Sequence, residues 1–249
     1  MTEKRTPLAD LEGLSARIEG PEVGKLLWAA QTAHVFAGKD ELLPVFTYVR
    51  MHVGDGRLTF TATDRYGIVR AGVDIVQLEE EPYPGRMMLA PAKALVDAVK
   101  QLWAAIPTRD RKTTVADLSV VNGRLLMSAR LRSGVDPLVA VPLADDSFGE
   151  FPLVDKLIDH DPADKPLGER SLARFGLSGA EALPKLAKLP KLPGSKHQPH
   201  LIFDTNGPGK PMRVLVIPPH STATETATDP SSAEAVILLM PLRVEQPDR

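Results

Sequence analysis

The chain has 249 residues, 43% of them hydrophobic, with a formal net charge of −2 and a pI near 6.3. This size suits one or two globular domains with a sizeable core. The absence of cysteine excludes disulfides, thiol nucleophiles and cysteine-ligated metal sites. The acidic balance excludes a protein that coats nucleic acid over its whole surface, so any DNA contact must be local.

The first predicted unit follows a polar tail, residues 1–13. Leu14 to Glu19 alternates as a strand does, and Gly20-Pro21 then opens a helix whose apolar positions keep three-and-four spacing until Gly38. Three strands follow, at Val45–Val53, at Leu58–Thr63 and at Ile68–Ile75. The last two strands meet at Asp64-Arg65-Tyr66-Gly67, which presents charged and aromatic groups at a corner.

The second predicted unit repeats this order. Arg86 to Ala90 is a short strand, and Pro91 opens a helix with an apolar stripe at Leu95, Val99, Leu102 and Trp103. Strands at Thr113–Val121 and Arg124–Leu131 flank Asn122-Gly123, a strong hairpin signal, and Val135–Leu143 adds another. Repetition of the order predicts two copies of one supersecondary unit packed side by side.

The third predicted unit is less regular. Residues 145–170 are polar and proline-bearing around the apolar Phe151-Pro152-Leu153, and we predict a linker at 159–170. A strand at Leu172–Leu177 and a helix within 179–191 follow, the helix short or broken because an interior proline costs about 3 kcal/mol. Strands are predicted at His200–Thr205, Met212–Ile217 and Ala235–Arg243. The predicted division is therefore 14–158, 171–244 and a tail at 245–249, in an α+β fold of repeated strand–helix–three-strand units with antiparallel sheets.

No catalytic motif stands out, and we predict no enzyme activity and no cofactor. The chain has no phosphate-binding P-loop, no Gly-x-Ser-x-Gly elbow and no His-Glu-x-x-His pair. His197 and His200 lack a nearby third ligand, and Asp145-Asp146 are adjacent residues of a polar segment whose side chains diverge. We expect loop histidines and solvated carboxylates, and no metal site.

Positive charge gathers locally. Such groups can line a path for phosphates, with affinity that falls as salt rises; the alternative is that they only solubilise short amphipathic segments. The candidate DNA-binding residues are Lys25, Lys93, Lys100, Arg109, Arg111, Lys112, Lys185, Lys188 and Lys191. Because no signal peptide or span of about 20 apolar residues is present, the sequence favours a cytoplasmic protein.

Four motifs occur in a fixed order: TATDRYGIV at Thr61–Val69, VNGRLLMSAR at Val121–Arg130, EFPLVDKLI at Glu150–Ile158 and VILLMPLRV at Val236–Val244. With the repeated unit, they resemble the bacterial DNA polymerase III β subunit family, the sliding clamps. Residues 14–158 resemble its middle domain and 170–244 the second half of its last domain. Three units stand where family clamps carry six, so the resemblance does not extend to the closed head-to-tail ring.

The resemblance implies a site for partner peptides where the middle and last domains meet. An apolar surface with an adaptable methionine suits an extended peptide anchor. By motif position its residues are Thr63, Tyr66, Ile68, Pro152, Leu157, Met240, Pro241, Leu242 and Arg243. The alternative for 240–242 is an edge strand of the core, and Pro241 favours an edge because it cannot donate to a ladder.

The resemblance thus implies a non-enzymatic, clamp-like processivity protein. It would bind replication or repair proteins, such as a DNA polymerase, through short peptides and contact duplex DNA without sequence preference, alone or as a homo-oligomer. The alternative is a regulatory or ligand-sensing module that reuses the clamp fold without a ring. A small-molecule enzyme on a repeated α/β unit is the third reading, and it lacks any supporting nucleophile–base or phosphate motif.

Overall fold

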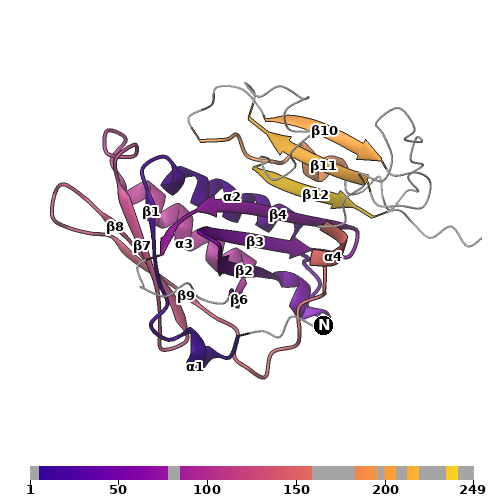
Figure 1. The fold of residues 1–249 in the computed structure, drawn as a ribbon, viewed down its shortest axis with the longest axis horizontal. Helices are drawn as coiled ribbons and strands as arrows, with labels where there is room; N and C mark the ends of the chain where they lie inside the picture. The colour runs from indigo at the N-terminus through magenta and orange to yellow at the C-terminus, as the bar shows by residue number, and fades with distance from the viewer. Residues whose placement is uncertain are drawn as a thin grey trace, which may run out of the picture.

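The computed structural model describes residues 6–77, 85–158, 183–193, 195, 199–205, 212–218 and 234–240. Two antiparallel sheets share one hydrophobic core with two long helices that lie side by side (Figure 1). The α+β fold class with antiparallel sheets is confirmed.

Strand–helix–three-strand order is confirmed for the first two units. The first comprises β1 (Ser15–Glu19), α2 (Glu22–Phe36), β2 (Tyr48–Gly54), β3 (Arg57–Thr63) and β4 (Gly67–Asp74). The second comprises β6 (Arg86–Pro91), α3 (Ala92–Ala105), β7 (Val115–Val121), β8 (Arg124–Arg130) and β9 (Leu138–Pro142). Pro21 and Pro91 precede the two helices, where a missing N–H costs nothing. Asn122 and Gly123 both have positive φ, as the predicted hairpin requires.

The third unit contributes β10 (His200–Thr205), β11 (Met212–Ile217) and β12 (Ala235–Leu239). A single helical turn at 183–186 agrees with the short helix expected there. The predicted strand at 172–177 and the linker at 159–170 lie outside the described residues. The division of the chain into domains stays a prediction.

The larger sheet runs through two sequence regions that are far apart. Its strand order is β10-β11-β12-β4-β3-β2-β6, and β12 pairs antiparallel with β4 from Ala235 opposite Ala71 to Leu239 opposite Gly67. The third unit therefore extends the sheet of the first unit in its own chain. The smaller sheet has the order β5-β1-β7-β8-β9, with β5 at Val76–Gln77.

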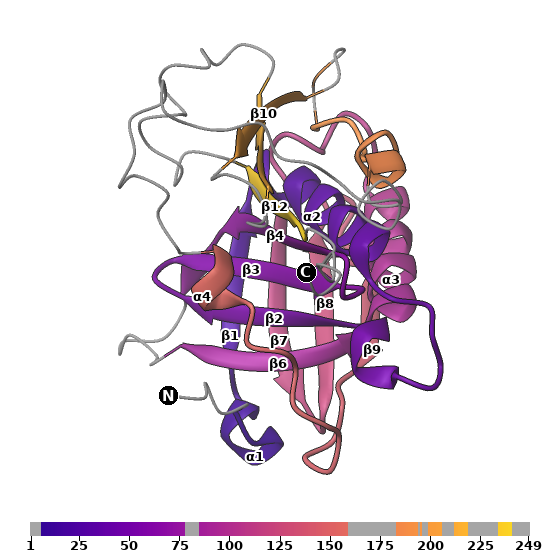
Figure 2. The ribbon, with the colours of Figure 1, turned by 90° about the vertical axis from the view of Figure 1, so that its right-hand side faces the viewer.

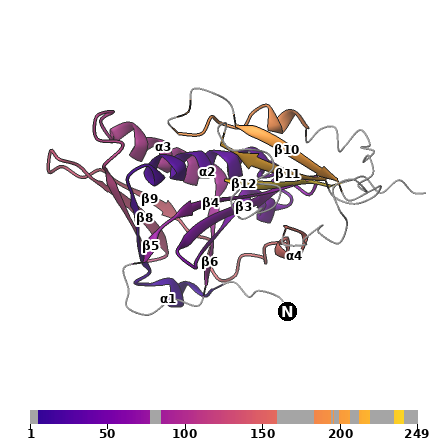
Figure 3. The same cartoon turned by 45° about the horizontal axis from the view of Figure 1, so that its top comes forward.

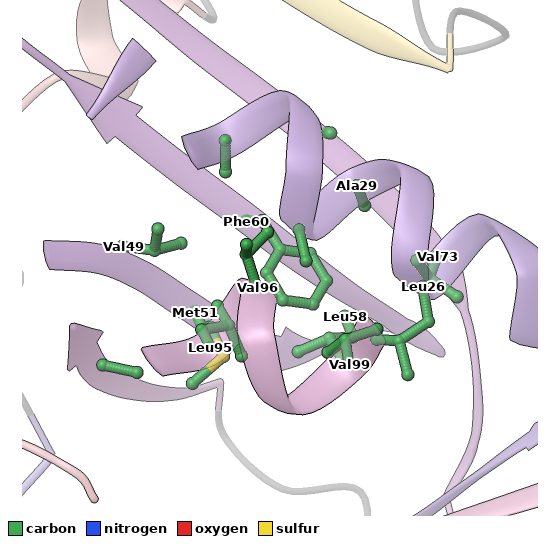
Figure 4. Packing of buried hydrophobic residues seen from close by; sticks show 14 of the residues in the cluster. Leu26, Ala29, Val49, Met51, Leu58, Phe60, Val73, Leu95, Val96 and Val99 are labelled. Carbon is green, nitrogen blue, oxygen red and sulfur yellow. The ribbon is translucent and has the colours of Figure 1, made fainter. Parts of the chain in front are cut away.

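The core fills the space between the sheets and the helices. Leu58, Phe60 and Ala62 alternate inward as predicted, and Figure 4 shows Phe60 between side chains of α2 and α3. Residues 183–193 lie over α2: Trp28 Nε1 donates to the Pro190 carbonyl at 3.0 Å, and Leu189 and Leu192 join the core. Figure 2 shows the helical turn of this segment beside α2 and α3.

Gly24 of α2 allows this close approach. A β-carbon built at Gly24 would lie 2.9 Å from Pro193 Cβ and 3.3 Å from the Trp103 ring. Both distances are shorter than an ordinary van der Waals contact. The helix can therefore be this close to residues 183–193 and α3 only where it lacks a side chain.

Two local predictions are wrong, and one short helix was not predicted. The strand expected from Val45 begins at Tyr48, because Pro44–Thr47 forms a 3-10 turn (η1) in which Thr47 Oγ1 donates to the Pro44 carbonyl at 2.8 Å. The polar tail includes a helix at Leu8–Leu11 (α1), and Glu12 there accepts the Asn122 and Gly123 N–H groups at 3.1 and 3.0 Å. The polar segment after β9 includes a four-residue helix at Asp155–Ile158 (α4).

Candidate functional site at the corner of the larger sheet

One carboxylate shapes the corner between β3 and β4. Asp64 Oδ1 accepts hydrogen bonds from the backbone N–H groups of Tyr66 at 3.1 Å and Gly67 at 2.9 Å, an Asx turn. Its other oxygen pairs with the Lys185 ammonium. The corner is therefore held in one shape and tied to residues 183–193.

The last described strand ends at this corner. The Met240 N–H donates to the Tyr66 carbonyl at 2.9 Å, directly after β12 leaves β4. Successive side chains of a strand point to opposite faces, so Leu238 and Val236 share the outer face with Ile68 and Arg70. TATDRYGIV and VILLMPLRV, far apart in sequence, meet at one place.

A second apolar cluster covers that outer face. Figure 3 shows α4 and α2 on opposite faces of the larger sheet. The buried members of the cluster come from the sheet and from the segment after β9: Ile68, Leu89, Ala144, Phe151, Val154, Ile158 and Leu238. Met240 and Tyr48 pack against it partly exposed, and the Tyr48 and Phe148 rings lie 4.2 Å apart between centroids.

An ion triad pins the same segment to the sheet. The Asp155 carboxylate of α4 accepts hydrogen bonds from the guanidinium groups of Arg50 and Arg70. Both arginines lie opposite Thr61 in the strand pairing, so they form one row across β2, β3 and β4. The Arg50 guanidinium also lies over the Phe151 ring at 5.6 Å, and its side chain is only 4% exposed.

The triad sets the charge of Asp155. Burial, the largest single influence, disfavours the charged carboxylate, but the hydrogen bonds and charges of Arg50 and Arg70 together outweigh it. The pKa of Asp155 therefore lies below its ordinary value, and the carboxylate is ionised at neutral pH.

The structure brings part of the predicted peptide site together. Thr63 lies opposite Ile68 in the strand pairing, and both are buried, while Tyr66, Leu157 and Met240 offer exposed or half-exposed surface. Pro152 and Leu157 adjoin Phe151 and Ile158, which belong to the second cluster. Pro241, Leu242 and Arg243 lie outside the described residues. We call the exposed part of this surface, Tyr66, Pro152, Leu157 and Met240, the corner patch.

Some of the nine predicted DNA-binding cations are held in ion pairs. Lys25 pairs with Glu22 at 2.9 Å and Glu234 at 3.2 Å, and Lys185 with Asp64. Burial is the largest single influence on Lys25 and lowers its pKa. The two glutamates together raise the pKa by more than burial lowers it, so it lies above the ordinary value. The geometry gives these two ammonium groups structural partners.

The remaining predicted cations lie on or near α3 and on residues 183–193. Lys93 pairs with Asp97 at 2.9 Å on the exposed side of α3, and Arg111 lies over the Trp103 ring at 4.6 Å. Arg109 lies 3.8 Å from Asp110. The exposed members of this set are Lys93, Lys100, Arg109, Lys112, Lys188 and Lys191.

No protein-family model matches the chain. A beta sliding clamp from Streptomyces coelicolor is 36% identical over 74 residues, which cover 30% of this chain and 19% of that protein. Solved structures match over nearly the whole chain: the DNA polymerase sliding clamp from Bacillus subtilis, with a TM-score of 0.58 and 15% identity, covers 98% of this chain and 67% of its own. A protein assigned as a DNA polymerase III beta subunit from Eubacterium rectale has a TM-score of 0.59 at 8% identity, covering 94% and 67%.

The chain has the sliding-clamp fold. The resemblance seen in the four motifs is thereby confirmed, and the match in fold to the Bacillus subtilis clamp covers 98% of the chain. The clamp fold is shared at low sequence identity, so it establishes the architecture and leaves activity and partners to be proposed from the site.

The described residues show neither a metal-binding cluster nor a membrane span. No three His, Asp or Glu side chains among them gather as metal ligands do, and none of their helices is long and apolar enough to cross a membrane. His197 lies outside that part of the chain.

Sequence reasoning missed the Arg50–Asp155–Arg70 triad and the role of Phe151. Asp155 lies in a segment interpreted as polar and irregular, and the arginines lie 105 and 85 residues away from it. The one signal in the sequence was that these arginines occur in strands whose other positions are mostly apolar or threonine. A charged side chain in such a strand needs a partner when its face of the sheet is covered.

Proposed function

We propose that this chain is a non-enzymatic, sliding-clamp-like protein that binds short peptides of replication or repair proteins at the corner patch. The supporting observation is the hydrogen bond from Met240 to the Tyr66 carbonyl, which joins the two sequence motifs beside a half-exposed methionine. Methionine adapts to varied apolar partners, and an exposed aromatic ring beside it gives area at low entropic cost.

The expected ligand is a peptide with a glutamine followed by aliphatic and aromatic anchors. Burying one apolar side chain stabilises a complex by about 1.5–3 kcal/mol before ordering costs, so micromolar affinity is the realistic scale. Because Thr63 and Ile68 are buried, the first contacts of such a peptide are with Tyr66, Leu157 and Met240.

Titration calorimetry with such a peptide tests the proposal. Truncating Met240 to alanine is expected to weaken binding about tenfold, because it removes most of an apolar contact. The matched control is Leu138→Ala, an equally simple truncation at an exposed leucine of β9 in the other sheet, which should leave affinity unchanged. Failure of the folded wild-type protein to bind the peptide would reject the proposal.

We further propose that duplex DNA is contacted electrostatically by the face that carries α3 and residues 183–193. Lys100 of α3 and Lys188 of residues 183–193 support this, because these two segments meet at Gly24, and the Arg111 guanidinium lies over the Trp103 ring of α3. Binding of this kind neutralises phosphates without reading bases, so it should be weak and independent of sequence. Whether copies of the chain assemble around DNA is measured by light scattering with and without duplex.

A further inference from the structure

Arg65 occupies a backbone conformation that suits arginine poorly. Its φ is +82°, and among the described residues the other non-glycine positions with positive φ are Asp55 and Asn122, both in hairpin turns. Asp and Asn tolerate the left-handed region because their short side chains can hydrogen-bond to the nearby backbone, whereas the long side chain of arginine makes no such compensating bond. Strain of this kind is retained at positions that serve recognition more often than elsewhere.

The surrounding turn holds Arg65 in place. Its backbone N–H donates to Thr63 Oγ1 at 3.1 Å, and the next two N–H groups are bound by Asp64. The fixed turn therefore sets the point and direction at which the Arg65 side chain leaves the backbone.

Two aromatic rings and one distant carboxylate surround the guanidinium. It lies 5.9 Å from the Phe46 ring centroid and 5.8 Å from that of Tyr66, and the side chain stays 50% exposed. Its nearest acidic partner among the described residues is Asp40, with Nη2 and Oδ2 4.0 Å apart, at the outer limit of an ion pair. The other Asp40 oxygen accepts the Leu42 N–H at 3.0 Å. An oriented, half-exposed guanidinium without a close carboxylate is suited to take one from outside.

The position of Arg65 connects this feature to peptide binding. Tyr66, 40% exposed, belongs both to the corner patch and to the aromatic surroundings of Arg65. A peptide whose apolar anchors rest on Tyr66 and Met240 thus passes within reach of the guanidinium.

We propose that Arg65 is a specificity-determining residue that selects peptides carrying an aspartate or glutamate beside their apolar anchors. The inference rests on the peptide binding proposed above and adds the charge of the ligand. The Arg65 guanidinium donates to the incoming carboxylate, and Asp40 competes with that carboxylate for the same group.

Paired peptides test the inference. One peptide has the apolar anchors and a single aspartate, moved in turn through each flanking position, and its partner has asparagine there. The wild-type protein should bind the best-placed aspartate peptide about fivefold more tightly than its asparagine twin, the scale of a partly exposed ion pair. Asp40→Asn should enlarge this preference by releasing the guanidinium.

Variants at Arg65 separate recognition from folding. Arg65→Asn tolerates positive φ, so it should keep the melting temperature of the wild type and its affinity for the asparagine peptide, while the aspartate preference disappears. Arg65→Lys should retain part of the preference. The matched control, Arg132→Asn, removes the same charge from an exposed arginine in the β8–β9 connection and should leave the preference intact.

The outcomes are distinguishable. If the asparagine peptide binds and no aspartate position improves its affinity, the inference is rejected while the proposed function stands. If Arg132→Asn abolishes the preference as Arg65→Asn does, general attraction explains the effect and the inference is likewise overturned. If neither peptide binds, the peptide site and the role of Arg65 are both rejected.

Discussion

At Asp155, burial and ion pairing act on the same carboxyl in opposite directions, and pairing prevails. Replacing Asp155 by asparagine deprives Arg50 and Arg70 of the carboxylate that they share, and should lower the free energy of unfolding at pH 7 by about 3 kcal/mol. Asp97→Asn is the control: it removes a solvent-exposed pair with Lys93 and should leave the free energy of unfolding nearly unchanged. Urea denaturation measures both, and equal effects would contradict a structural role for the triad.

The lowered pKa of Asp155 also determines how stability depends on pH. Because the pKa of Asp155 is lower in the folded than in the unfolded chain, its charge stabilises the fold at neutral pH. That contribution is lost as the pH falls below the ordinary aspartate range and through the lowered pKa. The wild type should therefore lose stability on acidification more steeply than Asp155→Asn.

At the scale of elements, the contact between α2 and residues 183–193 depends on Gly24. Gly24→Ala gains about 1 kcal/mol of helix propensity but forces Pro193 away from the helix. We expect a lower melting temperature and a red-shifted tryptophan emission, because the Trp28 ring becomes exposed to solvent and loses its hydrogen bond to the Pro190 carbonyl. Gly149→Ala, where no atom lies within 4 Å of the added carbon, should change neither. An unshifted emission in Gly24→Ala would show that the segment lies elsewhere in solution.

Elements with a clear period could be predicted from the sequence, and long-range contacts could not. The alternation of Leu58, Phe60 and Ala62 and the turn at Asn122-Gly123 are local, so they predicted β3 and the β7–β8 hairpin correctly. The strand expected at Val45 failed because a side-chain bond within η1 outweighs β-propensity. The candidate corner site was predicted only from the resemblance of motifs, since nothing local to Tyr66 indicates that the Met240 N–H donates to its carbonyl.

For the whole molecule, the proposed DNA contact predicts a salt dependence. Changing Lys100, Arg111 and Lys188 together to glutamine should reduce the slope of log affinity against log salt by about 2–3, close to one unit for each phosphate that is no longer neutralised. The control changes three other exposed arginines to glutamine, Arg124 and Arg130 of β8 and Arg132 after it. The buried residues of β8 are Leu125, Met127 and Ala129, so the arginines lie away from the core. Filter retention at several salt concentrations gives both slopes. An unchanged slope, or equal changes in the two variants, would mean that α3 and residues 183–193 are ordinary surface.

The pairing of β12 with β4 also affects the order in which the chain can fold during synthesis. During synthesis, β4 emerges early, but the strand that completes its outer edge is made only when Ala235 to Leu239 are added. At about 5–20 residues per second, the edge of β4 waits on the order of ten seconds for its partner. An unpaired strand edge is a template for wrong pairing. The nascent chain is thus open to misassembly at the same corner for which we propose peptide binding.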